Sequence, residues 1–257
     1  MASQLDRAAA FQRLHVKGSP LVLYNIWDAG TAQVVARAGA KAIATGSWSV
    51  AAAHGFSDGE TMPLESALAN LREIVGAVEL PVTIDLEAGY GAAPSVVAES
   101  ASKVLQAGAI GFNLEDQVMG TDTLYSIAEQ SARVRAAREA ADRVGIPAFI
   151  NARTDLFLKA DPARHDGALV AAAIERAEAY ATAGASGFFA AGLVDEALIG
   201  RLCAACPLPV NILVRPNTTS GKRLAELGVA RISYGPGPYR AATQAMEAAA
   251  RAALASW

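Results

Sequence analysis

Short apolar segments rich in β-branched residues recur along the chain, and each is followed by turn residues and a stretch with apolar positions three and four apart. The short segments predict buried strands, and the longer stretches predict amphipathic helices. Helical stretches such as 127–145 and 168–185 close on Gly or Ala-Gly, as helices commonly do. Eight segments carry the strand pattern: LVLYNI (21–26), AIATG (42–46), VTIDL (82–86), IGFNLE (110–115), AFINAR (148–153), GFFA (187–190), VNILV (210–214) and RISYG (231–235).

The regular alternation of strands and helices predicts an α/β fold with parallel strands joined by right-handed crossovers. An open doubly wound sheet and a closed barrel both fit this alternation. Eight units in 257 residues, without a dinucleotide-binding fingerprint, favour a (β/α)₈ barrel. The length suits a single barrel domain over residues 1–257.

Polar side chains gather where the predicted strands end, which is the place where barrels of this kind carry their chemistry. Asp85 and Glu87 follow the third strand two residues apart, so both side chains lie on the same side of an extended segment. Glu115 and Asp116 end the fourth strand, and Arg153 ends the fifth. Acidic groups that converge repel one another unless their pKa values rise or a cation neutralises them.

A divalent ion held by oxygen ligands is one explanation of this acidic set, since Mg²⁺ is usually bound by one or two carboxylates, several waters and the substrate. The alternative is that Asp85 accepts a neighbouring backbone N–H and that Gly89, Tyr90 and Gly91 form an ordinary turn. Arg153 can bind a carboxylate bidentately, or it can form an ion pair with Asp85, Glu115 or Asp155.

Composition and charge exclude several classes of partner. A net charge of −3 with 18% charged residues leaves no basic face for nucleic acid, so a small molecule is the expected partner. The first 15 residues lack the apolar core of a signal peptide, and no stretch is apolar over about 18 residues, so we expect a cytoplasmic protein without a membrane partner. Cys203 and Cys206 stand in a helical pattern and are expected to be structural.

Five motifs, in order along most of the chain, resemble the isocitrate lyase and phosphoenolpyruvate mutase superfamily, specifically its smaller mutase-like members. The metal motif Asp-x-Asp-x-Gly-Tyr-Gly stands here as DLEAGYG (85–91), with Glu87 in place of the second Asp. The other four are TGSWSVAAAHGFSDGE (45–60), NLED (113–116), NARTD (151–155) and the Asn of PVNIL (209–213).

The resemblance implies that Asp85 contacts Mg²⁺, or Mn²⁺, directly, while Glu87 and Glu115 hold the waters of the metal. It places Asp58 with Glu115 and Arg153 in the catalytic set. It also implies substrate binding by Gly46, Ser47, Trp48, Arg153 and Asn211. Trp48 is larger than the family's usual residue, so it either narrows the pocket or packs beneath its loop.

The shared chemistry of the superfamily is a pyruvate-type enolate chelated to the metal, which makes the chain an expected lyase. The loop QVMGTDTLYSIAEQ (117–130) lacks the Lys-Lys-Cys-Gly-His element of the family's lyases. Residues Thr121, Asp122, Thr123 and Tyr125 there form either a lid over substrate or an ordinary surface loop. The remaining chemistry is C–C cleavage or decarboxylation of a 2-keto or 2-hydroxy dicarboxylate, such as oxaloacetate, methylisocitrate or an alkylmalate.

Two other functions stay open: phosphoenolpyruvate mutase or phosphonopyruvate hydrolase chemistry, disfavoured because the loop has no lysine, and a barrel that binds small carboxylates without catalysis. The resemblance further implies a homodimer or homotetramer that exchanges the last helix, predicted over 239–257 and ending at Trp257. The turn SYGPGPYR (233–240) is expected to be structural, because its prolines remove donors that a phosphate would need.

Overall fold

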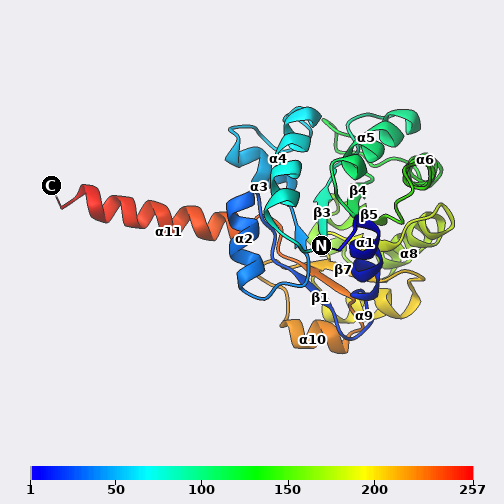
Figure 1. Cartoon of the computed structure of the whole chain (residues 1–257). Helices are drawn as coiled ribbons and strands as arrows, with labels where there is room; N and C mark the ends of the chain where they lie inside the picture. The colour runs from blue at the N-terminus through cyan, green and yellow to red at the C-terminus, as the bar shows by residue number, and fades with distance from the viewer. Residues whose placement is uncertain (1, 257) are drawn as a thin grey trace.

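The computed structural model describes residues 2–256 and contains eight parallel strands surrounded by helices (Figure 1). The strand order is β1-β8-β7-β6-β5-β4-β3-β2, and every neighbouring pair is parallel. The two ends of this sheet meet through an isolated parallel bridge between Ile26 and Thr45. The predicted (β/α)₈ barrel is therefore confirmed.

The strands are β1 (Leu21–Leu23), β2 (Ile43–Ala44), β3 (Val82–Asp85), β4 (Gly111–Glu115), β5 (Phe149–Thr154), β6 (Gly187–Ala190), β7 (Val210–Leu213) and β8 (Arg231–Ser233). The helices are α1 (Gln4–Arg13), α2 (Ala29–Arg37), α3 (Ser47–Ala53), α4 (Leu64–Ala77), α5 (Pro94–Gln106), α6 (Ile127–Val144), α7 (Leu156–Lys159), η1 (Pro162–Arg164, a 3₁₀ turn), α8 (Gly167–Thr182), α9 (Glu196–Ala205), α10 (Gly221–Glu226) and α11 (Gly237–Leu254).

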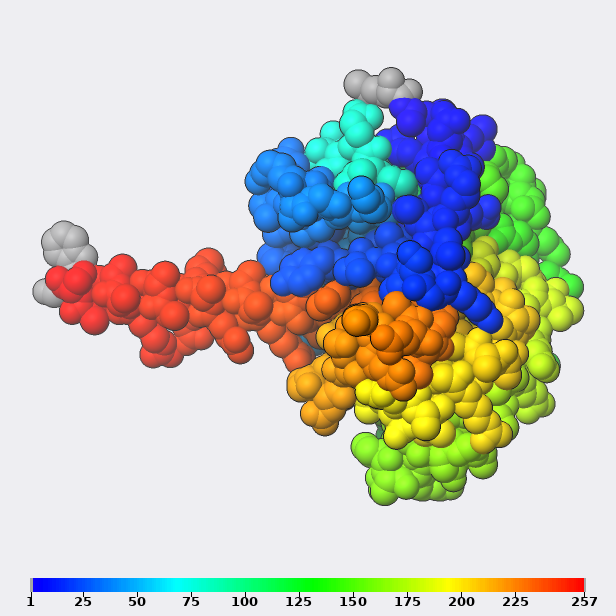
Figure 2. Space-filling view, turned by 90° about the horizontal axis from the view of Figure 1, so that it is seen from below, coloured from blue at the N-terminus to red at the C-terminus, as the bar shows by residue number. Residues whose placement is uncertain are grey.

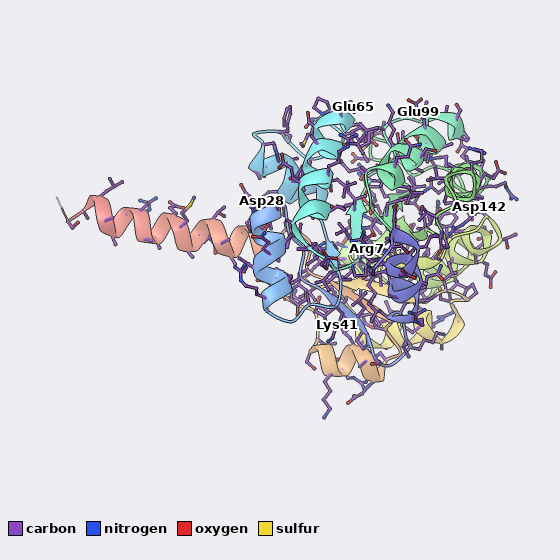
Figure 3. All side chains as sticks on the ribbon, viewed as in Figure 1. Arg7, Asp28, Lys41, Glu65, Glu99 and Asp142 are labelled. Carbon is purple, nitrogen blue, oxygen red and sulfur yellow. The ribbon has the colours of Figure 1, made fainter. Side chains whose placement is uncertain are left out.

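Side chains along each strand alternate between the surrounding helices and the barrel interior. Phe112 of β4 is fully buried in the cluster that the strands form with the helices, whereas its neighbour Asn113 faces the barrel interior. Helix ends follow the sequence: Ser126 and Glu129 form a capping box at the start of α6, and Gly145 ends it with φ 80°. Charged residues such as Glu65, Glu99 and Asp142 lie outward on the encircling helices (Figure 3).

The first strand is shorter than the predicted 21–26 because the chain leaves the sheet after Leu23 and uses the side chain of Asn25 instead. The Asn25 amide donates to the carbonyl of Thr45, and its Oδ1 accepts from the backbone N–H groups of Tyr234 and Gly235. One buried side chain thus joins β1 to the segments that follow β2 and β8. The turn after β8 directs these two N–H groups to Asn25, which supports its structural interpretation.

Helix α11 projects away from the barrel as a separate arm (Figures 1 and 2). Pro238 is the only residue of this helix that is buried, and Met246 and Leu254 are 70% and 78% exposed. Trp257, the predicted end of the helix, lies outside the described residues. Within residues 2–256, no helix has both the length and the apolar content needed to cross a membrane.

Candidate active site

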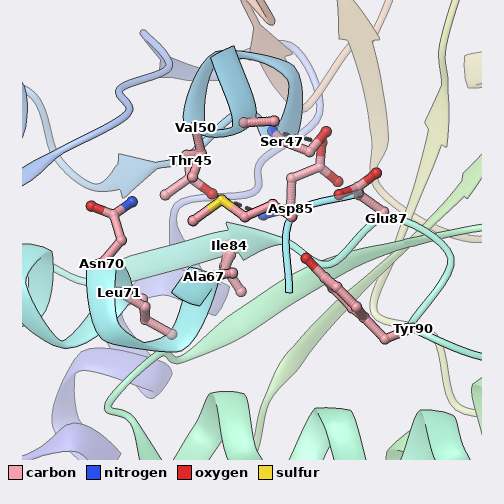
Figure 4. Close-up of a pocket in the computed structure, with 12 residues that line it drawn as sticks. Thr45, Ser47, Val50, Ala67, Asn70, Leu71, Ile84, Asp85, Glu87 and Tyr90 are labelled. Atoms are coloured by element: carbon pink, nitrogen blue, oxygen red, sulfur yellow. Dashed lines mark hydrogen bonds between the residues drawn. The ribbon is translucent and has the colours of Figure 1, made fainter. Parts of the chain in front are cut away.

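A cavity of about 140 Å³ opens where the strands end, at the edge of the barrel predicted to carry the chemistry. Asp85 and Arg153, from the carboxyl-terminal parts of β3 and β5, both line it. A smaller cavity of about 20 Å³ lies behind Asp85 (Figure 4). The larger cavity is lined by Asn25, Gly46, Ser47, Trp48, Asp58, Asp85, Asn113, Arg153, Phe189, Leu213, Ser233, Gly235 and Pro236.

Asp85 is the last residue of β3, and one of its two carboxylate oxygens lacks a partner. Oδ2 accepts from the Ser47 hydroxyl at 3.0 Å, while the Ser47 N–H lies at 3.5 Å (Figure 4). The backbone N–H of Asp85 donates to the Thr45 hydroxyl, which fixes the end of the strand. Oδ1 is buried and makes no hydrogen bond within residues 2–256. An unpaired buried carboxylate oxygen is costly unless a cation or a donor completes it.

Arg153 forms ion pairs with three carboxylates at once, as one of the sequence interpretations anticipated. Nη1 lies 2.7 Å from Glu115 and 3.8 Å from Asp85, and Nε lies 2.6 Å from Asp155. Burial by itself would lower the pKa of Arg153, but the charges of Glu115, Asp155 and Asp85 raise it above its usual value. Burial raises the pKa of Glu115 against the opposing charge of Arg153.

Glu87 connects the strand β3 end to the loop that follows β2. Its backbone is left-handed, with φ 52°, and its Oε2 accepts from the N–H groups of Gly59 (2.9 Å) and Glu60 (2.7 Å). In return, the carboxylate of Glu60 accepts from the N–H of Tyr90 at 2.6 Å. Burial, with the charges of Asp85, Asp58 and Glu60 added, raises the pKa of Glu87 to about 7 despite the opposing hydrogen bond from Glu60.

Asp58 is brought to the cavity by the loop that Glu87 holds. Asp58 is an exposed residue, yet partial desolvation of its carboxyl and the charge of Asp85 raise its pKa, and Arg153 opposes that rise. Glu60, Glu87 and Tyr90 are the non-glycine residues of the described chain with positive φ. Their clustering marks the joint between the two loops as locally strained.

Trp48 lines the cavity, as one of its two interpretations predicted, and its ring packs against the start of α11. Its ring lies 5.8 Å from that of Tyr239, and the guanidinium of Arg240 sits 4.8 Å from its centroid. Phe189, Leu213 and Pro236 add further apolar surface to the cavity. A substrate therefore meets carboxylates and Arg153 on one side and apolar groups on the other.

Among the predicted site residues, Glu87, Glu115, Asn211 and the lid residues do not line the larger cavity; Glu87 lines the smaller one, and Glu115 pairs with Arg153. Asn211 is fully buried in β7 and accepts from the Ser233 hydroxyl. Thr121 and Thr123 bond to each other in a small hairpin, and Lys159 from α7 binds the Thr121 carbonyl and Asp122. Lys159 thus places near the loop a positive charge that the loop sequence itself lacks, but its ammonium is paired with Asp122.

Tyr125 lies in the second arm of this hairpin, where its N–H donates to the Asp116 carbonyl. The guanidinium of Arg133 lies 4.1 Å from the centroid of the Tyr125 ring. Asp116, next to it in space, is buried and accepts from Arg176, from the Tyr180 hydroxyl and from the N–H of Asp155. This network anchors the loops after β4 and β5. It is a supporting structure behind the cavity, and Asp116 does not reach the cavity wall.

Several cavity residues were missed from the sequence: Asn113, Phe189, Leu213, Ser233, Gly235 and Pro236. Asn113 had a usable signal, since it stands two residues before Glu115 on the same strand and therefore shares its inward face. The apolar residues had none, because an inward-facing Phe or Leu at a strand end reads like any other core residue.

The donor set fits a hard divalent ion bound with few protein ligands. No three His, Cys, Asp or Glu side chains within residues 2–256 converge into a complete ligand set. The free Oδ1 of Asp85, with Glu87, Glu115 and Asp58 around it, instead fits Mg²⁺ held by one direct carboxylate and by waters.

These features define a (β/α)₈ barrel with Asp58, Asp85 and Arg153 in a cavity at the carboxyl ends of its strands. Within that class, the chain belongs to the isocitrate lyase and phosphoenolpyruvate mutase superfamily, because the family model described as "Phosphoenolpyruvate phosphomutase" matches residues 11–254. The resemblance carried by the sequence motifs is thereby confirmed.

Relatives and solved structures agree with this assignment. The crystal structure of a putative phosphonomutase from Burkholderia cenocepacia is 51% identical, with a TM-score of 0.96 over 98% of this chain and 100% of that one. The 2-methylisocitrate lyase of Escherichia coli is 31% identical over 78% of this chain and 67% of its own length. An oxaloacetate decarboxylase of Pseudomonas entomophila is 29% identical over 95% of this chain and 83% of its own length.

Proposed function

We propose that the protein is a Mg²⁺-dependent lyase that forms a pyruvate-type enolate by C–C cleavage or decarboxylation of a small 2-keto or 2-hydroxy dicarboxylate. The observation that carries this proposal is the buried, unpartnered Oδ1 of Asp85 at the wall of a small cavity, beside Arg153. Relatives named as a 2-methylisocitrate lyase and an oxaloacetate decarboxylase support the reaction class.

Asp85 would hold the metal directly, and Glu87 and Glu115 would hold its waters; Mn²⁺ could take the same place. Bound there, the ion supplies positive charge that offsets the negative charge growing on the substrate oxygens in the transition state. Glu87 accepts hydrogen bonds at Oε2 from the N–H groups of Gly59 and Glu60. Its other oxygen is left to orient a water.

The side chains around the cavity would bind and orient the substrate. Arg153 presents Nη1 between Glu115 and Asp85, where a substrate carboxylate can share it. Ser47 offers a hydroxyl and an N–H beside Asp85, and Gly46 lets the backbone line the wall. Asp58 and Glu115 are the candidates for proton movement, since desolvation raises the pKa of both carboxyls above their usual values.

Cleavage of a C–C bond is favoured over P–C chemistry by the charge of the cavity. Arg153 is the only cation among the residues that line it, and it is already paired with carboxylates. A phosphonate brings more negative charge than a carboxylate and would need a further cation. Lys159 does not serve, because its ammonium binds Asp122 and the Thr121 carbonyl.

The direct test is turnover by purified protein. Oxaloacetate, 2-methylisocitrate, an alkylmalate and phosphonopyruvate are incubated with Mg²⁺ or with EDTA, and release of pyruvate or another 2-keto acid is followed. The proposal expects metal-dependent release from a C–C substrate, lost in Asp85→Asn. Release from phosphonopyruvate alone would establish P–C chemistry instead. Absence of turnover and of metal binding would leave a carboxylate-binding barrel.

We also propose that the protein is a homo-oligomer, a dimer or a tetramer, in which α11 packs against a second copy. Two features support this: the arm exposes apolar residues, and a groove of about 690 Å³ beside β1 and α2 exposes Val22 (48%) and Val34 (55%). In a (β/α)₈ barrel the outer face of a strand is ordinarily covered by helices. The cytoplasmic location expected from the sequence stays a prediction.

A further inference from the structure

A buried arginine lies one step beneath the wall of the cavity. Arg231 is the first residue of β8, and Ser233, two residues further along the same face, lines the cavity. Arg231 is 1% exposed, and no ion pair joins it to a carboxylate within residues 2–256. Its Nε and Nη1 make no hydrogen bond there, and Nη2 donates to Oδ1 of Asn113 at 3.2 Å. A buried cation with so few partners is costly to the fold.

The contact with Arg231 fixes the orientation of the Asn113 amide. Arginine can only donate, so the atom that it contacts must be the amide oxygen of Asn113. The same oxygen also accepts from Nδ2 of Asn151 at 2.9 Å. Both hydrogen bonds of the Asn113 side chain end on Oδ1, and Nδ2 makes none within residues 2–256.

The free amide nitrogen belongs to a residue of the cavity wall. Asn113 pairs with Asp85 in the register of β3 and β4, and both residues line the cavity together with Arg153. Because Oδ1 is bonded to Arg231 and Asn151, the two N–H groups of the Asn113 amide are the polar atoms left for a ligand in the cavity. A neutral donor is thereby held beside Asp85, in a wall whose carboxylates are Asp58 and Asp85.

We propose that Asn113 is a further substrate-binding residue, whose amide donates to an anionic oxygen of a 2-oxo acid or its enolate, and that Arg231 is the positioning residue that orients this amide. The inference rests on the proposed function, because it assigns the ligand of the same cavity. The chemistry that fits is a small planar anion with adjacent oxygens, one for the metal side at Asp85 and one for the amide.

The charge of Arg231 favours the same class of ligand. Burial lowers the pKa of Arg231 to about 9, and the charge of Asp85 opposes that shift. The guanidinium is therefore positively charged at neutral pH, and Asp85 is the carboxylate that acts on it from the cavity. An anion that binds at Asn113 would bring negative charge toward this buried cation, whereas a neutral ligand would not.

The test uses oxalate, a planar dianion with adjacent oxygens, titrated calorimetrically into the full-length protein with saturating Mg²⁺. Asn113→Asp keeps the shape of the side chain and its acceptor toward Arg231 and Asn151, but it replaces the donor on the cavity side by an acceptor. We expect its oxalate affinity to fall by about a hundredfold or more, while Mg²⁺ alone binds at least as tightly as before.

Arg231→Met frees the amide to turn, and oxalate affinity is expected to fall by about tenfold. The melting temperature should hold or rise, because a buried cation with unpaired donors is removed. Arg231→Lys, which keeps the charge and one donor, should recover part of the lost affinity. If Arg231 and Asn113 only stabilise the core, Arg231→Met should lower the melting temperature and leave oxalate affinity unchanged. That result would overturn the proposal. If the unmodified protein binds Mg²⁺ but no oxalate, the proposed function fails along with it.

Discussion

Shortening Glu87 to Asp tests whether its carboxylate holds the loop that carries Asp58. In the structure Oε2 accepts from the N–H groups of Gly59 and Glu60, and an Asp at this position is one methylene too short to reach them. Glu87→Asp should therefore destabilise the protein and loosen this loop, although Asp is the residue that the family motif carries at the equivalent position.

The size of the effect follows from three contributions. Hydrogen bonds to a charged group contribute about 1.5–3 kcal/mol each. Gly59 and Glu60 are half-buried, so water replaces part of that, and we take about 1 kcal/mol for each bond. Asp tolerates the left-handed backbone at this position better than Glu, which returns about 0.5 kcal/mol. The net loss is about 1.5 kcal/mol, or a fall of about 3–6 °C in melting temperature for a domain of this size.

The assay is chemical and thermal unfolding at pH 8 in EDTA, combined with amide hydrogen exchange at Gly59 and Glu60. Glu87→Gln is the matched control, because it keeps the reach and an acceptor oxygen and should lose less stability than Glu87→Asp. Both amides should exchange faster in Glu87→Asp. Unchanged stability and unchanged exchange in that variant would refute the account of the loop.

Three further predictions concern the rest of the molecule. Asp116→Ala removes the carboxylate that pairs with Arg176 and leaves the buried N–H of Asp155 without its acceptor, so it should cost about 3–5 kcal/mol in urea unfolding; a loss below about 1 kcal/mol would contradict the network. Burial and the charge of Arg231 lower the pKa of His15 in the folded protein to about 3. As pH falls below about 6.5, the imidazole of His15 is therefore protonated in the unfolded chain but not in the folded protein. Stability should then fall by up to about 1.4 kcal/mol per pH unit, and His15→Phe should flatten that slope. Met246→Glu should convert the proposed oligomer to a monomer by light scattering, as should Val22→Glu; an unaffected mass would exclude this interface.

The sequence was most informative where one local rule governs many residues. Short apolar segments rich in β-branched residues located all eight strands, although β1, β2, β3, β4, β7 and β8 are shorter than predicted. The rule that barrel chemistry lies at strand ends then brought Asp85, Ser47 and Arg153 into one cavity, as the structure has them. Such rules succeed because side-chain direction in a strand is fixed by the backbone.

Other features depend on contacts across the barrel that no local pattern records. Asn113 and Arg231 are 118 positions apart, and their hydrogen bond depends on how far β8 is staggered against β4. The left-handed backbone at Glu87 and its reach to the loop after β2 are likewise tertiary features. Asn211 shows the converse: it stands on the correct strand, yet it lies too deep to line the cavity.

The measurement that tests the central claim most directly is calorimetric titration of Mg²⁺ into the protein and into its Asp85→Asn variant. The substitution keeps the side-chain shape and an oxygen for the Ser47 hydroxyl, while it removes the charge and the free carboxylate oxygen. We predict one Mg²⁺ site in the unmodified protein, weakened by more than about a hundredfold in the variant. Equal Mg²⁺ binding by the two proteins, or none by either, would contradict the account.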